Sequence, residues 1–200
     1  MSLAVLAITF GLIFLVELPD KTFIAALVLS TRYRPLAVWL GVSLAFLVQT
    51  LIAVTLGHAV TLLPREVVEI VSIVIFLVGA VLLFREAPGA DESEAASEQE
   101  FASKASVDRT GIAAVGASFL VLFAAEWGDL SQLLTISLVG RYHDPVSVFF
   151  GAWAALVVVS GLAVVVGKVA LRYVKLSVIH YIGAAVCVLL AVITLVDVLR

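Results

Sequence analysis

Long apolar regions alternate with short polar breaks along the chain, and the apolar regions have the length of membrane-spanning helices. A helical span needs about 20 apolar residues. Regions that meet or approach this length cover residues 3–30, 36–63, 67–84, 111–139, 146–166 and 176–199. The first and the fourth are interrupted by acidic residues near the middle. The pattern predicts an all-α integral membrane protein with six transmembrane helices.

The longest polar stretch, residues 85–109, separates the third apolar region from the fourth. It carries Asp91, Glu92, Glu94, Glu98 and Glu100 among alanines and serines. This composition is typical of a solvated, largely disordered linker. We therefore expect a first three-helix unit over residues 1–84, an acidic linker over 85–109 and a second three-helix unit over 110–200.

The two units repeat one another in sequence. A single alignment without gaps pairs Glu17 with Glu126, Asp20 with Asp129, Thr22 with Ser131, Arg32 with Arg141, and Tyr33 with Tyr142. After one inserted residue, Pro35 matches Pro145, Gly41 matches Gly151 and Ala45 matches Ala155. A duplicated unit with an odd number of spans enters the membrane from opposite sides. The sequence therefore predicts two inverted repeats, as in many secondary transporters.

Composition agrees with the membrane class. Hydrophobic residues make up 63% of the chain and the mean hydropathy is +1.21, whereas soluble domains are about 45–50% apolar. Residues 1–16 lack a basic segment and a small-residue cleavage site, so we interpret them as the first span and not as a removable signal. No basic tract indicates nucleic-acid binding, and Cys187 as the single cysteine allows no intrachain disulfide.

Basic residues in the loops predict the orientation, because they collect on the cytoplasmic side. One side would hold Arg32, Arg34, Arg85, Lys104, Arg109, Lys168, Arg172 and Lys175. The other side would hold Arg65, Arg141 and Arg200. We therefore expect the linker in the cytoplasm and both termini outside, in a cell membrane of bacterial type.

The candidate chemistry lies in the two acidic motifs. Glu17 and Asp20 are three positions apart, as are Glu126 and Asp129, which places each pair on one helix face. A charge at mid-bilayer costs roughly 2.5–3.5 kcal/mol, so paired carboxylates in matching form indicate a function. Pro19 and Gly128 occupy equivalent positions between them. Both favour a break in the helix, so helices one and four should be kinked or broken.

The motifs offer oxygen ligands only. Carboxylates, the hydroxyls of Thr22 and Ser131, the amide of Gln132 and backbone carbonyls suit Ca²⁺, Mn²⁺ or Mg²⁺. Crowded carboxylates in a low dielectric also bind protons readily. A site that holds a divalent cation or protons, but not both together, is the minimal part of an antiporter. Lys21 would either pair with a carboxylate or extend toward the cytoplasmic side.

These motifs resemble those of the Gdt family, which is also known through transmembrane protein 165. Its signature is Glu-x-Gly-Asp-(Lys/Arg)-(Ser/Thr), once per three-span repeat, with an acidic linker between the repeats. The resemblance implies a cation/proton antiporter for Ca²⁺ and Mn²⁺, with no cofactor and no enzymatic activity. It implies that Glu17, Asp20, Glu126 and Asp129 are the cation ligands, with Thr22 and Ser131 beside them. The chain departs from the signature at Pro19 and at Leu130.

The leading hypothesis is therefore export of Mn²⁺ or Ca²⁺ from the cytoplasm in exchange for protons. The alternatives are an exporter of a small organic cation or amino acid, an intramembrane aspartyl protease, and a structural membrane protein. The sequence leaves the oligomeric state open, with a homo-oligomer as one alternative.

Other polar residues have simpler interpretations. Gln49, Thr50 and Thr55 would line the cavity or hydrogen-bond between helices. Asp197, His143 and His180 lie at the ends of spans, where we interpret them as interfacial residues.

Overall fold

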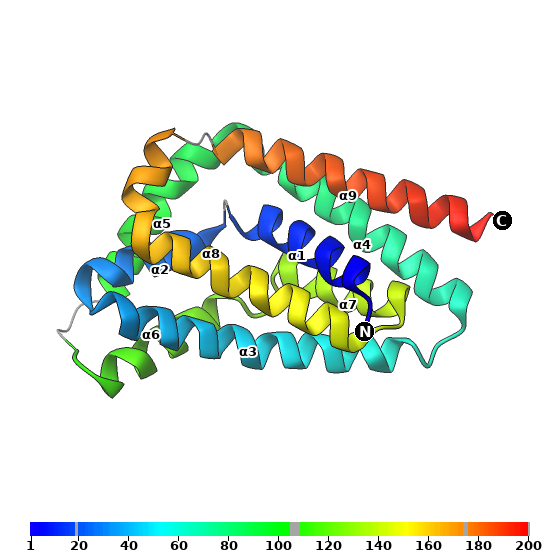
Figure 1. The fold of residues 1–200 in the computed structure, drawn as a ribbon. Helices are drawn as coiled ribbons and strands as arrows, with labels where there is room; N and C mark the ends of the chain where they lie inside the picture. The colour runs from blue at the N-terminus through cyan, green and yellow to red at the C-terminus, as the bar shows by residue number, and fades with distance from the viewer. Residues whose placement is uncertain (19, 105–108, 174–175, 200) are drawn as a thin grey trace.

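The computed structural model describes residues 1–18, 20–104, 109–173 and 176–199, and helices dominate this part of the chain (Figure 1). In chain order the helices are α1 (Leu3–Glu17), α2 (Lys21–Arg32), α3 (Pro35–Val60), α4 (Arg65–Glu86), the 3₁₀ turn η1 (Ala87–Gly89), α5 (Ala90–Lys104), α6 (Ile112–Ala125), α7 (Leu130–Tyr142), α8 (Pro145–Tyr173) and α9 (Leu176–Val198).

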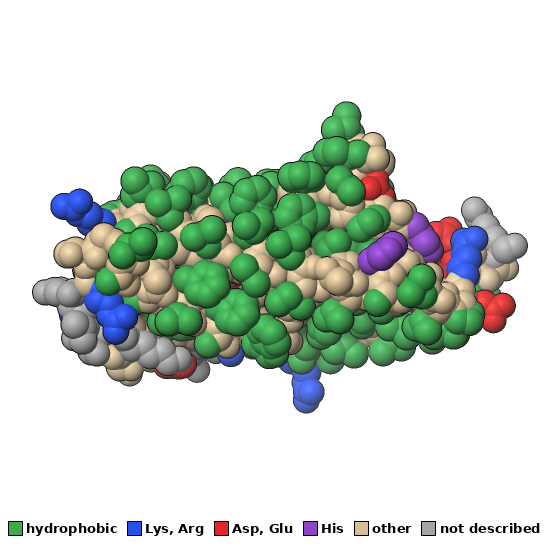
Figure 2. Space-filling view, turned by 90° about the horizontal axis from the view of Figure 1, so that it is seen from below, with side chains coloured by type: hydrophobic (Ala, Val, Ile, Leu, Met, Phe, Trp, Pro, Cys, Tyr) green, Lys and Arg blue, Asp and Glu red, His purple; other side chains and the backbone are tan. Residues whose placement is uncertain are grey.

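Four helices, α3, α4, α8 and α9, are each long and apolar enough to cross a membrane. The pairs α1–α2 and α6–α7 are bent by 68° and 72°, and counting each bent pair as one span gives up to six spans among the described residues. The predicted interruption of helices one and four is therefore confirmed. Figure 2 shows hydrophobic side chains over the middle of one face, with most charged side chains toward its two ends.

The chain termini define two ends of the molecule. Both termini lie at the right of Figure 1, and α5 lies at the left. We call the first end the terminal side and the second the linker side. At the terminal side Asp144 precedes α8, and its carboxylate accepts hydrogen bonds from the hydroxyl and the N–H of Ser147 and from the N–H of Ser2. The Ser147 hydrogen bonds hold the pKa of Asp144 below its usual value.

The two repeats interlock through matched glycines. A Cβ at Gly41 on α3 would lie 2.9 Å from the Cβ of Ser118 on α6, and closer still to the Val115 carbonyl oxygen. A Cβ at Gly151 on α8 would lie 2.9 Å from the Cβ of Thr9 on α1. Thr9 and Ser118 are themselves equivalent in the alignment of the two motifs. The helix of the second span in each repeat, α3 or α8, thus packs against the first half-helix of the other repeat, α6 or α1. This exchange agrees with inverted repeats.

The acidic linker differs from the expectation. Residues 90–104 form helix α5, which packs against α2. Ser97 and Phe101 are buried, with 8% and 3% of their surfaces exposed. Over the described residues of this segment the prediction of disorder was wrong, because a few buried side chains are enough to hold a polar helix against the bundle. Residues 105–108 of the predicted linker lie outside the described residues.

Candidate functional site

Each acidic motif lies at the junction of two half-helices. Helix α1 ends at Glu17, and Asp20 is the N-cap residue of α2. Helix α6 ends at Ala125, and Asp129 is the N-cap residue of α7. In the second junction Gly128 has a φ of 81°, a conformation that glycine adopts without strain. Pro19 lies outside the described residues.

The two junctions bring the four motif carboxylates together. One oxygen from each of Glu17, Asp20, Glu126 and Asp129 lies within 4.8 Å of the other three. Glu17 and Glu126 are buried, with 0% and 3% of their surfaces exposed, and the two aspartates are half-buried. Each aspartate stands at the N-terminus of a half-helix, where the helix dipole stabilises negative charge. The sequence predicted this group of four residues but not their mutual distances.

Glu17 lies deepest in the carboxylate cluster. Its Oε1 accepts a hydrogen bond from the Thr22 hydroxyl, which is also buried. Its Oε2 is buried and has no hydrogen-bond partner among the described residues. A buried carboxylate oxygen without a donor is well suited to binding a cation or a proton. Thr22 therefore orients Glu17 from the half-helix that follows it.

Ser131 and Gln132, the remaining residues that the sequence predicts at the site, make hydrogen bonds at the break between α6 and α7. Ser131 is buried, and its N–H donates to the Asp129 carboxylate at 3.1 Å. The Gln132 Oε1 accepts the Gly128 N–H at 3.0 Å. In this structure the Gln132 carbonyl oxygen therefore stabilises the turn at Gly128, and its role as a cation ligand stays a prediction.

Gln49 is a further buried polar residue near the second break. Its amide nitrogen donates to the Phe123 carbonyl oxygen at 2.9 Å, joining α3 to α6. Since α6 ends at Ala125, this carbonyl lacks its usual helical donor. Of the two interpretations of Gln49, the interhelical hydrogen bond is the one observed.

A cavity of about 370 Å³ borders the carboxylate cluster. It extends from Asp20 and Asp129 to residues at the linker side, among them Glu86 and His180. The Glu86 Oε2 and His180 Nε2 atoms are 4.0 Å apart. Lys21 lines the cavity and is exposed, and no ion pair within 4.0 Å joins it to a carboxylate in the described part of the chain. The cavity gives the cluster a route to the linker side.

The sequence interpretation missed Glu86 and His180. The sequence alone places His180 at the membrane interface and Glu86 in the linker. The sequence does contain a signal for Glu86. The internal repeat extends to the last helix of each unit, where it makes Glu86 equivalent to Asp197. Without the packing of α4 against α9, neither residue could be connected to the acidic motifs.

The arrangement defines the class of the protein. Two inverted helical repeats, each with a broken helix that contributes two carboxylates to a shared buried site, are features of membrane transporters. The chain belongs to the GDT1 family of divalent cation/proton antiporters, whose family model matches residues 5–91 and 114–200.

Curated relatives agree with this family. The chain is 30% identical to the chloroplastic GDT1-like protein 1 of Oryza sativa subsp. indica, over 97% of its own length and 62% of the relative's. It is 29% identical to a GDT1-like protein of Synechocystis, over 94% of this chain and 96% of that one. It is also 29% identical to a candidate manganese exporter of Vibrio cholerae, over 96% and 90% of the two chains. No solved structure gives a significant match.

Proposed function

We propose that this protein exchanges a divalent cation, Mn²⁺ or Ca²⁺, for protons at the cluster of Glu17, Asp20, Glu126 and Asp129. The observation that carries the proposal is the meeting of one oxygen from each residue within 4.8 Å. Four carboxylates in a low-dielectric site repel one another strongly. A dication or bound protons relieve that repulsion, so each displaces the other. Movement of the cation is then coupled to movement of protons, because both compete for the same carboxylate oxygens.

The family supports the cation and the counter-ion. The matched family consists of divalent cation/proton antiporters, and the Vibrio cholerae relative is a candidate exporter of manganese. The chain spans about three-fifths of the length of the rice relative, so the substrate is carried over here as a proposal. An all-oxygen site fits Mn²⁺ and Ca²⁺ and disfavours softer ions.

We further propose export from the cytoplasm across a cell membrane, with the linker side facing the cytoplasm. The basic residues predicted at that side outnumber those at the terminal side, and among them Arg32 ends α2 and Arg34 is the N-cap residue of α3. The cavity that borders Asp20 and Asp129 extends to the same side. A cytoplasmic cation would therefore reach the cluster without any rearrangement of the helices.

Proton flux in proteoliposomes tests the proposed site. In vesicles that contain a pH-sensitive dye, a Mn²⁺ or Ca²⁺ gradient should drive proton movement in the opposite direction. Asp20→Asn and Asp129→Asn should each abolish this flux, because each removes a shared ligand and proton acceptor. Glu66→Gln is the matched control, since Glu66 is exposed in the first turn of α4. Normal flux in both aspartate variants would overturn the assignment.

An intramembrane aspartyl protease is the second function that the geometry allows, because Asp20 and Asp129 belong to the same cluster. The two glutamates in that cluster and the family of transporters favour transport. Cleavage of a membrane substrate that Asp20→Asn blocks, without any cation-coupled flux, would reverse this choice.

A further inference from the structure

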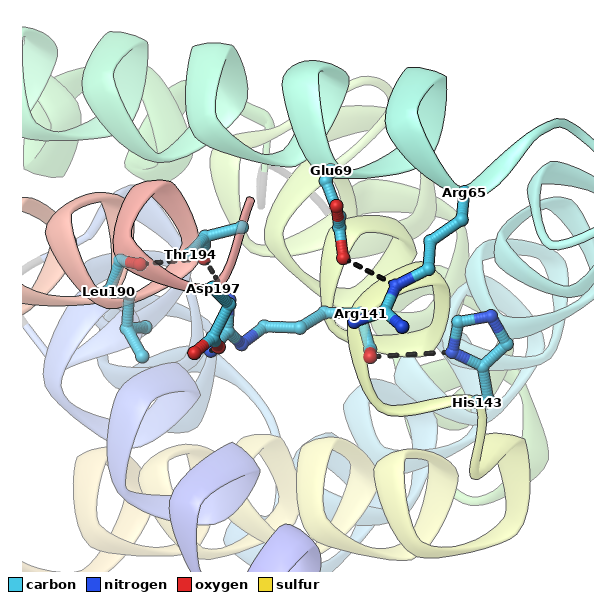
Figure 3. Close-up of polar contacts among 7 residues, drawn as sticks. All are labelled: Arg65, Glu69, Arg141, His143, Leu190, Thr194 and Asp197. Carbon is cyan, nitrogen blue, oxygen red and sulfur yellow. Dashed lines mark hydrogen bonds and ion pairs between the residues drawn. The ribbon is translucent and has the colours of Figure 1, made fainter. Parts of the chain in front are cut away.

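At the terminal side, an ion pair joins the end of α7 to the end of α9. The Arg141 Nη2 atom lies 2.8 Å from the Asp197 Oδ2 atom, and its Nη1 donates to the Thr194 hydroxyl (Figure 3). The Arg141 side chain is only 11% exposed, whereas that of Asp197 is 47% exposed. The pair forms part of the wall of a surface pocket of about 440 Å³, which also contains Arg65, Glu69 and His143.

Beneath this pair, α7 packs closely against α4. A Cβ at Gly140 would lie 2.9 Å from a methyl group of Val68, and one at Gly79 would lie 3.1 Å from a methyl group of Leu130. Ser72 is buried between the two helices, 3.5 Å from the Ser137 carbonyl oxygen. The route from the carboxylate cluster to the terminal side is therefore closed by helix packing and covered by the Arg141–Asp197 pair.

The internal repeat identifies the equivalent residues at the linker side. Helices α4 and α9 align without gaps so that their buried positions coincide: Val68 with Ile179, Ser72 with Gly183, Phe76 with Cys187, Gly79 with Leu190, Ala80 with Ala191 and Leu83 with Thr194. The same alignment makes Glu86 equivalent to Asp197, and the alignment of the acidic motifs makes Arg32 equivalent to Arg141.

These equivalent residues are arranged differently at the linker side. Arg32 is exposed and has no ion-pair partner among the described residues, while Glu86 lies beside His180. Lys21 and its equivalent Leu130 both line the cavity, and Leu130 also packs against Gly79 on α4. Over the parts of α2 and α9 that the structure describes, no packing comparable to that of α7 on α4 joins the two. The terminal side of the molecule is therefore closed, whereas the linker side holds the cavity.

We propose that Arg141 and Asp197 form the terminal-side gate of the transport route, and that Arg32 and Glu86 form its equivalent at the linker side in the opposite state. The inference rests on the proposed transport function. In the structure the terminal-side gate is closed and the cavity leads to the linker side. Transport requires the Arg141–Asp197 pair to separate while Arg32 and Glu86 come together, so each pair stabilises one of the two states.

Thiol accessibility tests the gate without requiring a transported ion. In a Cys187→Ala background, Ser72→Cys places a near-isosteric reporter between α4 and α7, and Ile24→Cys places a second reporter in the cavity wall. An impermeant thiol reagent is applied from each side to oriented proteoliposomes. Asp197→Asn should raise modification of the Ser72→Cys reporter from the terminal side on the order of tenfold, the effect of losing one charged hydrogen bond. It should lower modification of the Ile24→Cys reporter from the linker side.

Matched variants separate a gate from a general loss of stability. Asp197→Glu keeps the negative charge, so both reporters should be modified at the rates seen with Asp197. Arg65→Gln should change them much less, because the ion pair of Arg65 is with Glu69 on its own helix at 2.7 Å, and Asp197 acts on Arg65 only at longer range. Glu86→Gln should slow modification of the Ser72→Cys reporter, the reverse of Asp197→Asn. Equal effects of Asp197→Asn and Arg65→Gln on the modification rates would contradict the proposed gate. Faster modification of both reporters together would also contradict it.

The outcome also separates the gate from the proposed function. Reciprocal accessibility in a protein that shows no cation-coupled proton flux would support the gate and refute the proposed exchange. Normal flux with unchanged accessibility in Asp197→Asn would support the exchange and refute the gate.

Discussion

At the scale of single residues, the two acidic motifs end their helices with different residues at equivalent positions. Gly128 adopts a left-handed φ of 81°, and its N–H is held by the Gln132 side chain. Pro19 occupies the matching place in the sequence. A residue without a free N–H and a residue without a Cβ both make continuation of a helix unfavourable. The two motifs thus share the break itself, and the break places Asp20 and Asp129 at the N-cap positions of α2 and α7.

Substitution of Gly128 tests how much the second break depends on glycine. A Cβ there would meet no atom within 4 Å, so Gly128→Ala adds backbone strain without a steric clash. Left-handed conformations cost about 1–2 kcal/mol for residues other than glycine. We expect the midpoint of thermal unfolding in detergent to fall by roughly 2–8 °C on the scaling for chains of this size.

Gly116→Ala is the control for this variant, because Gly116 lies within α6 and is also free of close contacts. Alanine is the better helix former, so this variant should be at least as stable as the original protein. Equal stability of Gly128→Ala and Gly116→Ala would show that the turn tolerates a side chain and that its left-handed conformation is not required.

The residues of the cluster were predictable because each one conflicts with its apolar surroundings. A carboxylate in an apolar region is costly, and the same pair recurs at the matching place in the second repeat, which removes chance as an explanation. Asp197 and His180 gave no such signal, since charged residues at span ends are common. Their contacts with Arg141 and Glu86 join helices that are far apart in the sequence. Only the fold brings these side chains together.

At the scale of helices, close packing depends on small residues at matched positions. Gly41 on α3 and Gly151 on α8 each face a backbone carbonyl of the other repeat, that of Val115 or of Leu6. The lengths of the apolar regions predicted these helices well, with α3 beginning at Pro35 and α8 at Pro145. Helix α5 was missed because its mean composition is polar, although Ser97 and Phe101 are buried. Composition averages over a segment, whereas packing depends on particular side chains.

Alanine substitutions at the matched glycines test the inverted pair of contacts. Gly41→Ala and Gly151→Ala should each destabilise the protein by about 1–3 kcal/mol, because a Cβ would overlap backbone atoms that cannot rotate away. The two losses should be similar, since the contacts are equivalent. Thermal unfolding in detergent measures both.

Gly11→Ala serves as the control, since Gly11 lies within α1 and has no atom within 4 Å of the added Cβ. It should not lower the unfolding temperature. A large loss in only one of the two matched variants would argue that the helix contacts of the two repeats are not energetically equivalent.

At the scale of the whole molecule, neither repeat contains a complete site. Each contributes two of the four clustered carboxylates, and each presents an apolar helix face that the other covers at Gly41 or Gly151. The indole N–H of Trp39 donates to the Val157 carbonyl, and that of Trp153 donates to the Ser43 carbonyl. The repeats are therefore joined by side-chain contacts across their interface, and the carboxylate cluster forms only where they meet.

This architecture predicts that the chain can be divided between the repeats and still assemble. Residues 1–104 and 109–200, co-expressed as separate chains, should copurify through a tag on one of them and recover cation-coupled proton flux, because the interface contacts described above are non-covalent. Either half alone should show no flux, since it carries only two of the four carboxylates. Gly41→Leu in the first half should prevent copurification by blocking the approach of α3 to α6, whereas Gly11→Leu, on an open surface of α1, should not. Flux from one half alone would mean that a single pair of carboxylates is enough for exchange, and the shared site would then have to be abandoned.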